Sequence, residues 1–282
     1  MVKAKTPADL VITPRDRRFG RGVKQPRWWM NGDPIGTAFH NALSVTFPKG
    51  EAFFIESVRE FRDGAPPKLE EEIRAFTLQE VMHSREHVAF NRQVTDHGYD
   101  ISELERDVDE SMALTKGRPP ILNLIVTAGL EHYTAILAVM ALTDPRYFKG
   151  VDAAQADMWR WHAIEEIEHK GVAYDTWLHA TRDWPARRRW LVRCYMMFRV
   201  TGIFWVKRIR GTLNLLAQDG ITGWRARVRL TWYLLGYPGL MRRLMLPIAA
   251  FFRPGFHPWD RDDRALIGKV DSAYVDAELA PA

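Results

Sequence analysis

The chain has 282 residues, of which 46% are hydrophobic and 27% charged, a composition that can bury a core and is not typical of disorder. Its single cysteine, Cys194, excludes an intrachain disulfide and a zinc site built from several thiolates, as expected for a reducing compartment. The first residues contain no apolar segment of the kind that a secretory signal requires. We therefore expect a cytoplasmic protein of one large domain or two small ones.

The net charge of +5 hides an asymmetry along the chain. Residues 181–253 carry 15 Lys and Arg against 2 Asp and Glu, a balance of +13, which leaves −8 for the remainder. We expect the acidic part and the basic C-terminal part to have different surroundings.

The first 33 residues are rich in Pro, Arg and Gly and predict an irregular N-terminal arm, held to the rest of the chain by Trp28, Trp29 and Met30. Beyond this arm, Pro and Gly separate stretches that have the periodicity of helices. The predicted helices are residues 34–46, 51–62, 68–98, 99–117, 121–142 and 153–180. No useful stretch alternates as a strand does, so the predicted fold class is all-α.

The predicted helix 68–98 carries three polar side chains in the middle of an apolar stripe. Steps of three and four residues place Glu80, His83 and His87 on one face. The apolar positions of that face are Ile73, Phe76, Phe90 and Val94. Burying a polar group in a core without a partner costs about 2–7 kcal/mol. A metal ion would be such a partner, and Glu-x-x-His presents an oxygen and a nitrogen to the same side.

Two other helices each offer one carboxylate to the interior. Glu131 is the only acidic residue of the very apolar helix 121–142, which indicates a bound cation or a buried hydrogen-bond network; a salt bridge to a basic neighbour is the alternative. In helix 51–62, Glu51 lies with apolar residues, whereas Glu56 lies with charged residues and is expected to face solvent. The alternative role for Glu51 is stabilisation of a helix N-terminus.

The predicted helix 153–180 repeats the Glu-x-x-His pattern. His162, Glu166 and His169 follow one another at helical spacing and therefore share a face. Glu165 lies one turn before His169 and is a candidate for contact with it. We expect Glu168 to face solvent.

Four successive helices thus offer Glu, Glu-x-x-His, Glu and Glu-x-x-His on inward faces. Ferritin-like di-iron and di-manganese bundles have this ligand set. We predict a ferritin-like four-helix bundle with a dinuclear metal site in residues 34–182, and extra basic, Trp-rich helices packed on it in residues 183–282. Iron is the expected metal, with manganese and zinc as alternatives.

The strings PKGEAFF, EVMHSREH, GLEHYTA, WHAIEEIEHK and GFHPW resemble those of a bacterial family of predicted metal-dependent hydrolases, which is placed with the ferritin-like folds. The pattern His-x-x-x-Glu-x-x-His is similar to a motif of the di-iron arylamine N-oxygenases. The resemblance implies a metal site at Glu51, Glu80, His83, Glu131, His162, Glu166 and His169. His87 is not part of the minimal ligand set. Three roles remain open for it: an eighth ligand, a hydrogen-bond donor that orients a ligand, or a proton carrier.

The C-terminal third contains two apolar stretches, residues 190–206 and 230–252, that arginines interrupt. A spanning helix needs about 20 apolar residues with few charges, so we expect neither stretch to cross a membrane. We expect packed helices with arginines at the rim. The alternative is a peripheral contact with the inner face of the membrane, because Arg, Trp and Phe mix on amphipathic stretches. No nucleic-acid motif is present, so nucleic acid is not an expected partner.

Three functions fit this sequence. The first is a di-iron oxygenase or oxidase acting on an apolar small molecule, with His87 delivering protons and a separate partner donating electrons, since the chain has no flavin or nicotinamide motif. The second is a hydrolase whose two metal ions activate water toward an ester, amide or phosphate, with Glu165 or His87 as base. The third is metal binding without catalysis. The sequence favours the first and leaves the oligomeric state open.

Overall fold

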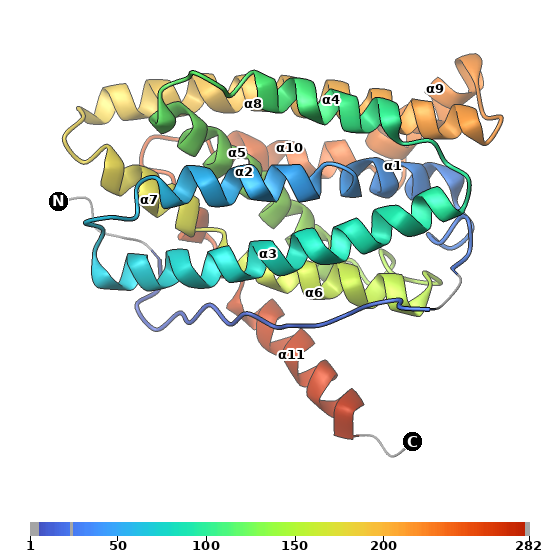
Figure 1. Ribbon diagram of the computed structural model, residues 1–282, viewed down its shortest axis with the longest axis horizontal. Helices are drawn as coiled ribbons and strands as arrows, with labels where there is room; N and C mark the ends of the chain where they lie inside the picture. The colour runs from blue at the N-terminus through green and yellow to red at the C-terminus, as the bar shows by residue number, and fades with distance from the viewer. Residues whose placement is uncertain (1–5, 23–24, 280–282) are drawn as a thin grey trace.

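The computed structural model describes residues 6–22 and 25–279, and in this part of the chain it contains helices and no strand. The predicted all-α fold class is therefore confirmed. The structure does not describe residues 1–5 and 23–24 of the predicted N-terminal arm or residues 280–282 of the predicted C-terminal part. The helices seen in Figure 1 are α1 (Pro34–Ser44), α2 (Phe47–Arg59), α3 (Pro67–Asp96), α4 (Ser102–Ala113), α5 (Pro120–Thr143), α6 (Ala153–His169), α7 (Val172–Ala180), α8 (Ala186–Gln218), α9 (Gly223–Thr231), α10 (Leu240–Ala250) and α11 (Arg264–Leu279), with a π-helical turn at Trp232–Gly236.

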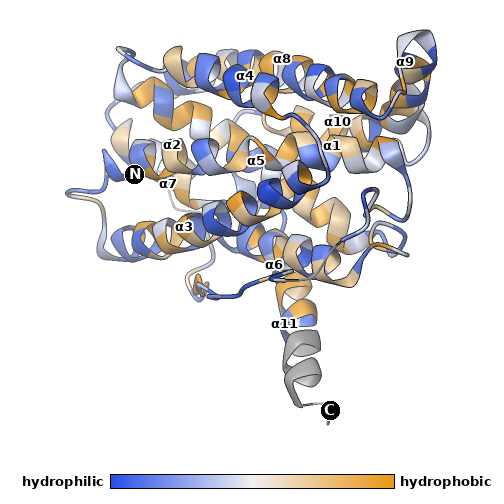
Figure 2. Cartoon of the chain, turned by 45° about the vertical axis from the view of Figure 1, so that its right-hand side comes forward, coloured by the Kyte–Doolittle hydropathy of each residue, from blue (hydrophilic) through white to orange (hydrophobic). Residues whose placement is uncertain are grey.

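Helices α2, α3, α5 and α6 surround the centre of the molecule. α2 packs against α3 and α5, α5 packs against α6 and α7, and α3 packs against α6 and α7. Hydrophilic residues mark the outward sides of α3 and α4 in Figure 2, as expected for helices with one face in a core. This arrangement is compatible with the predicted four-helix bundle.

Helix α5 is the most apolar part of the core. Among the described helices it is long and apolar enough to cross a membrane, yet 72% of its most apolar window is buried inside the protein. It packs against α2, α6, α7, α8 and α10. Its apolar composition is therefore explained by its central position in the fold.

Local sequence accounts for most helix boundaries. Asp33 caps α1 by accepting hydrogen bonds from the backbone amides of Ile35 and Gly36. Proline occupies the first turn of α2, α3 and α5, where its missing amide costs little. Just beyond α3, Gly98 has a φ of 84°, which glycine adopts without strain.

Two predicted boundaries are wrong. α2 begins at Phe47 instead of Glu51, because Pro48 starts the helix and does not break it. The predicted helix 153–180 is divided into α6 and α7 around Gly171. A Cβ atom at Gly171 would lie 2.9 Å from the Trp259 ring, so this glycine lets the segment after α10 approach the backbone closely.

The C-terminal third forms more helix than predicted. α8 is a single helix of 33 residues that packs along α1, α4 and α5. Two of its arginines are buried and not at the rim, contrary to our expectation. Arg193 donates hydrogen bonds to the Tyr174 hydroxyl and to backbone carbonyls, and Arg208 donates to the carbonyl of Ala42. Buried arginines of this kind are tolerated where main-chain carbonyls accept their protons.

The segment 6–22 runs as an extended arm beside α3 and α6 (Figure 1). Its backbone bonds to buried side chains of both helices. The amides of Thr13, Arg15 and Phe19 donate to Glu168, Glu165 and Glu86. The arm therefore closes the bundle over the carboxylates of α3 and α6.

Candidate metal centre

Four carboxylates and three imidazoles meet between α2, α3, α5 and α6. Each side chain is at most 3% exposed: Glu51, Glu80, His83, Glu131, His162, Glu166 and His169. The structure thus brings together the seven residues that the family resemblance implied as ligands. It also places Glu56 on the exposed side of α2, away from this cluster.

The potential ligand atoms form four overlapping groups of three, and the atoms of each group lie within 4.8 Å of one another. Two groups share Glu80: Glu80 with Glu131 and His169, and Glu80 with Glu51 and His83. The other two share His162: His162 with His83 and Glu166, and His162 with Glu51 and His87. Glu166 adjoins both groups that share Glu80, since its oxygens lie 3.5 Å from Nε2 of His169 and 3.8 Å from Nδ1 of His83. Two groups joined by shared carboxylates suit a pair of metal ions.

The cluster contains eight buried atoms without a hydrogen-bond partner. They are Oε1 of Glu51, both carboxylate oxygens of Glu80 and of Glu131, Nδ1 of His83, Oε2 of Glu166 and Nε2 of His169. An unpartnered buried polar atom costs about 1–3 kcal/mol, so most such atoms in proteins are paired. Oxygens and nitrogens of these types are the ligands that iron, manganese and zinc take. The residues present therefore fit a metal centre.

The two histidines of the Glu-x-x-His patterns are held by their outer nitrogens. Nε2 of His83 lies 3.0 Å from Oε2 of Glu165, and Nδ1 of His169 lies 2.9 Å from Oε1 of Gln79. Because each outer nitrogen donates to an oxygen, the inner nitrogen of a neutral ring carries a lone pair. Metal-binding histidines are typically oriented in this way.

Glu165 lies behind His83 and does not face the cluster. Its second oxygen accepts a hydrogen bond of 2.8 Å from the backbone amide of Arg15 and lies 3.6 Å from the Arg15 guanidinium. With both oxygens engaged, Glu165 orients His83, and this geometry argues against the role of base that we predicted. Glu168 also differs from our expectation, since it is 3% exposed and accepts hydrogen bonds from Arg15 and Gln79.

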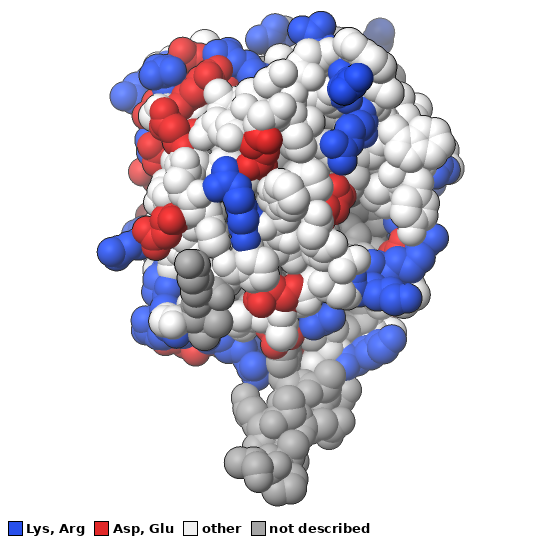
Figure 3. Space-filling view, turned by 90° about the vertical axis from the view of Figure 1, so that its right-hand side faces the viewer, with Lys and Arg blue, Asp and Glu red and all other residues white. Residues whose placement is uncertain are grey.

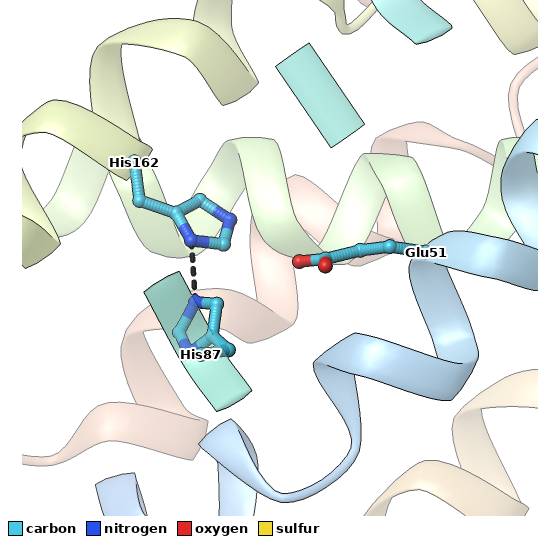
Figure 4. Close-up of side chains that lie close together, drawn as sticks. All are labelled: Glu51, His87 and His162. Carbon is cyan, nitrogen blue, oxygen red and sulfur yellow. Dashed lines mark hydrogen bonds between the residues drawn. The ribbon is translucent and has the colours of Figure 1, made fainter. Parts of the chain in front are cut away.

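A chain of hydrogen bonds links His87 and His162 (Figure 4). The Ser44 hydroxyl donates to Oδ1 of Asn91 at 2.7 Å and lies 2.8 Å from Nδ1 of His87. Nε2 of His87 lies 2.7 Å from Nδ1 of His162, and Nε2 of His162 lies 2.7 Å from Oε1 of Glu166. Burial lowers the pKa of His162 to about 4 and that of His87 well below its usual value, so both rings are neutral. His87 thus contacts and orients His162, and the two imidazoles together with Glu51 form one of the groups that could hold a metal ion.

Burial also changes the proton affinity of the cluster itself. It raises the pKa of Glu131 to about 8. It disfavours the charged form of His83, but hydrogen bonds and charges from Glu165 and Glu80 outweigh this effect and raise the pKa of His83 to about 10. Without metal, the cluster therefore retains protons near neutral pH on groups that a metal ion would bind.

Aromatic rings keep water from the cluster. Phe47 stacks on His87 with ring centroids 4.4 Å apart, and the edges of Phe76 and Trp161 contact His169 and His83, each with centroids 4.9 Å apart. Excluding water strengthens every electrostatic interaction inside. The rings therefore increase both the cost of leaving the carboxylates unpaired and the affinity for a cation.

Sequence reasoning missed Gln79 and Arg15. Gln79 lies one turn before His83, so the periodicity of α3 could have placed it on the same face. Arg15 is 150 residues from Glu165 along the chain, and no sequence pattern indicates that contact.

An all-α fold that buries carboxylates and imidazoles in this arrangement defines the protein as a candidate metalloprotein. A family model described as "Predicted metal-dependent hydrolase" matches residues 13–262, so the chain belongs to that family. This confirms the family resemblance noted in the sequence, and the matched range includes every residue of the cluster. No curated protein and no solved structure matches the chain.

Glu131→Gln is expected to hold roughly half of the wild-type metal or less, because it removes a charged ligand while keeping the size of the side chain. Metal content is measured by elemental analysis of protein purified from iron-supplemented cells. Glu56→Gln is the matched control: it changes an exposed glutamate of α2 and should leave metal content unchanged. Equal metal content in the two variants would mean that the cluster does not bind metal.

Metal-free protein is expected to lose thermal stability as the pH rises from 6.5 to about 10. The pKa of His83 is raised from 6.5 to about 10 by folding. The stabilisation of the folded state by protonated His83 is therefore complete below pH 6.5 and is lost as the pH rises through about 10. The raised pKa of Glu131, about 8, acts in the same direction. Bound metal replaces these protons, so the metal-loaded protein should show a smaller decline. Thermal melts of chelator-treated and metal-loaded protein across this range make the comparison, and identical curves would contradict it.

Proposed function

We propose that this protein is an enzyme that holds two metal ions in the cluster and uses them to hydrolyse an ester, amide or phosphate bond of a small molecule. The observation that carries the proposal is the set of eight unpartnered ligand atoms, seven on residues of the two groups that share Glu80 and the eighth on Glu166. The description of the family supplies the reaction class. Bound metal ions would provide a water of lowered pKa and would polarise the bond to be cleaved.

The side chains around the ligands would position them. Glu165 and Gln79 hold the outer nitrogens of His83 and His169, and Nε2 of His87 is hydrogen-bonded to Nδ1 of His162. Removing groups of this kind typically lowers metal affinity or activity about 10- to 100-fold. His87 and Glu165 therefore act on the ligands and not on the substrate.

The proton of the attacking water needs an acceptor inside the cluster. Glu51 is suited to this role, because Ser84 donates to its Oε2 at 2.7 Å while its Oε1 has no partner. Its carboxylate extends from α2 toward the pair formed by His87 and His162 (Figure 4). We assign the proton to Oε1 of Glu51, which would then act as base and not as a metal ligand, so that seven of the eight unpartnered atoms remain for the metal ions.

A second candidate function is the O2-dependent oxidation that the sequence alone favoured. The observation in its favour is the ligand set, since four carboxylates with two Glu-x-x-His helices are typical of di-iron centres. Oxygen-rich ligands also suit iron and manganese. This reaction would require a separate electron donor, because the chain has no flavin or nicotinamide motif. The family description supports hydrolysis better, so oxidation takes second place.

Protein purified from cells supplied with iron, manganese and zinc is expected to contain about two metal ions per chain. It should hydrolyse a nitrophenyl ester, an anilide or a nitrophenyl phosphate, lose this activity on treatment with a chelator and regain it when metal is returned. Elemental analysis and parallel turnover assays measure both properties. Two irons with O2 consumption and no hydrolysis would support the second candidate instead. Protein without metal would contradict both.

We also propose that the end of the molecule that carries α9 rests on an anionic membrane surface. Trp224, Val228, Trp232 and Leu235 follow one another at helical spacing, and each is about half exposed or more, up to 70% for Trp224. α9 projects from the body of the protein in Figure 1, and Figure 3 shows uncharged side chains over much of this end, with Lys and Arg and several Asp and Glu among them. Exposed tryptophans beside arginines are typical of helices that lie in a membrane interface.

The protein is expected to sediment with vesicles that contain phosphatidylserine at low salt, and less at high salt, because salt screens the attraction. Replacing Trp224 and Trp232 together by serine should reduce sedimentation. Leu78→Ser is the control, since Leu78 is an exposed apolar residue of α3. Absence of sedimentation with anionic vesicles would contradict the proposal.

A further inference from the structure

A cavity of about 380 Å³ lies between α1, α2, α4, α5 and α8, and none of the roles assigned above uses it. Its volume is within the range of small-molecule sites, about 300–1,000 Å³. Most of its wall is apolar and includes Leu43, Phe53, Leu104, Leu122, Val126 and Phe204. A hydrocarbon chain would be well accommodated by such a wall, because its transfer from water is favourable.

This cavity adjoins the metal centre. Leu43, Phe47 and Thr134 line it, and they also line a smaller cavity of about 40 Å³. The smaller cavity is bounded on its other side by His162 and Glu166 of the cluster. The ring of Phe47 lies 4.8 Å from that of His162, measured between centroids. A few side chains therefore separate the large cavity from the candidate metal ligands.

One buried charge in the wall, Arg208, is acted on by the charge of Asp107 but forms no ion pair with it. Arg208 is 5% exposed, its Nε lacks any hydrogen-bond partner, and it forms no ion pair with a described carboxylate. The single carboxylate of the wall, Asp107, lies instead 3.4 Å from Arg210, which is outside the cavity. The carbonyl of Ala42 and the charge of Asp107 compensate Arg208 only in part, since its Nε has no partner, so an anion from outside the chain would stabilise this site further.

The other charges of the wall have the same sign. Arg118, Arg199 and Lys207 line the cavity together with Arg208, against the carboxylate of Asp107. The cavity therefore combines an apolar surface with an excess of positive charge. This combination disfavours a cationic or a fully apolar ligand.

We propose that this cavity binds the substrate and that the substrate is an amphiphile with an apolar chain and one anionic group, such as a carboxylate, which Arg208 binds. The inference rests on the proposed function in one respect: that the apolar chain of the substrate passes Phe47 and is hydrolysed at the cluster. Binding in the cavity itself requires no metal ion. A carboxylate accepts two parallel hydrogen bonds from a guanidinium, which gives the anionic end a fixed position.

The experiment uses decanoate, 1-decanol and butanoate as probes, titrated by calorimetry into purified full-length protein whose metal content has been measured. Decanoate is expected to bind once per chain. It should bind about tenfold more tightly, or better, than 1-decanol, which lacks the charge, and than butanoate, which lacks most of the chain.

Three variants locate the binding site. Gly50 lines the cavity, and a Cβ atom there would meet nothing within 4 Å, so Gly50→Phe should fill open space and abolish binding of decanoate and 1-decanol. Gly202→Phe is the matched control, because Gly202 lies on α8 outside the wall and has equally open surroundings. Arg208→Met should still bind 1-decanol but lose the tenfold preference for decanoate. Circular dichroism checks that each variant is folded.

The outcomes separate this inference from the proposed function. Decanoate that fails to bind to metal-loaded wild-type protein, or binds no better than 1-decanol, overturns the inference and leaves the metal centre untouched. Gly50→Phe that folds and binds like the wild type also overturns it. If the purified protein contains no metal and still binds decanoate, the binding supports the inference about the cavity. The lack of metal then counts against the proposed metal centre.

Discussion

The structure depends on four glutamates that are buried together where no Lys or Arg of the described residues neutralises them. The side chains of Glu51, Glu80, Glu131 and Glu166 are at most 3% exposed. Charged carboxylates in such an interior lose hydration and repel one another, so their charges must be offset by protons or by bound cations. In the absence of metal, histidine protons offset part of this charge: despite burial, the charges of Glu131 and Glu166 raise the pKa of His169 well above its usual value. Metal binding would therefore stabilise the interior of this fold directly.

The N-terminal arm separates two kinds of buried carboxylate. Arg15 is bound by Glu165, Glu168 and Asp271, so the carboxylates that face outward from α6 are neutralised by an arginine. The cluster glutamates have no such partner. Glu165 also orients a side chain of the cluster. It accepts a hydrogen bond from Nε2 of His83 and so turns Nδ1 of that ring toward the cluster. A carboxylate paired with arginine orients a ligand, whereas a carboxylate with free oxygens is available to a cation.

The sequence indicated that these side chains face inward because each of them interrupts the apolar face of a helix, and helical periodicity can be read locally. Glu131 in apolar α5 and the Glu-x-x-His patterns of α3 and α6 are such interruptions. The failures involve contacts between distant segments. Glu168 is buried because Arg15 of the irregular arm pairs with it, and α6 ends before Gly171 where Trp259 approaches. Periodicity within one helix cannot predict such contacts, because the partner belongs to another part of the chain. The division into a bundle at 34–182 and a C-terminal part stays a prediction.

The same physical rule connects the metal centre to the neighbouring cavity. A buried charge that the fold does not neutralise indicates a partner from outside the chain, and the sign of the charge gives the sign of that partner. The glutamates of the cluster favour bound cations, whereas Arg208, whose Nε has no partner, favours an anion. Because Leu43, Phe47 and Thr134 lie between the two regions, a ligand anchored by its anionic end at Arg208 could extend its apolar chain toward the cluster. The distance between the anchor and Phe47 would then decide which bond of the chain comes nearest to the metal ligands, so the cavity would select substrates by length as well as by charge.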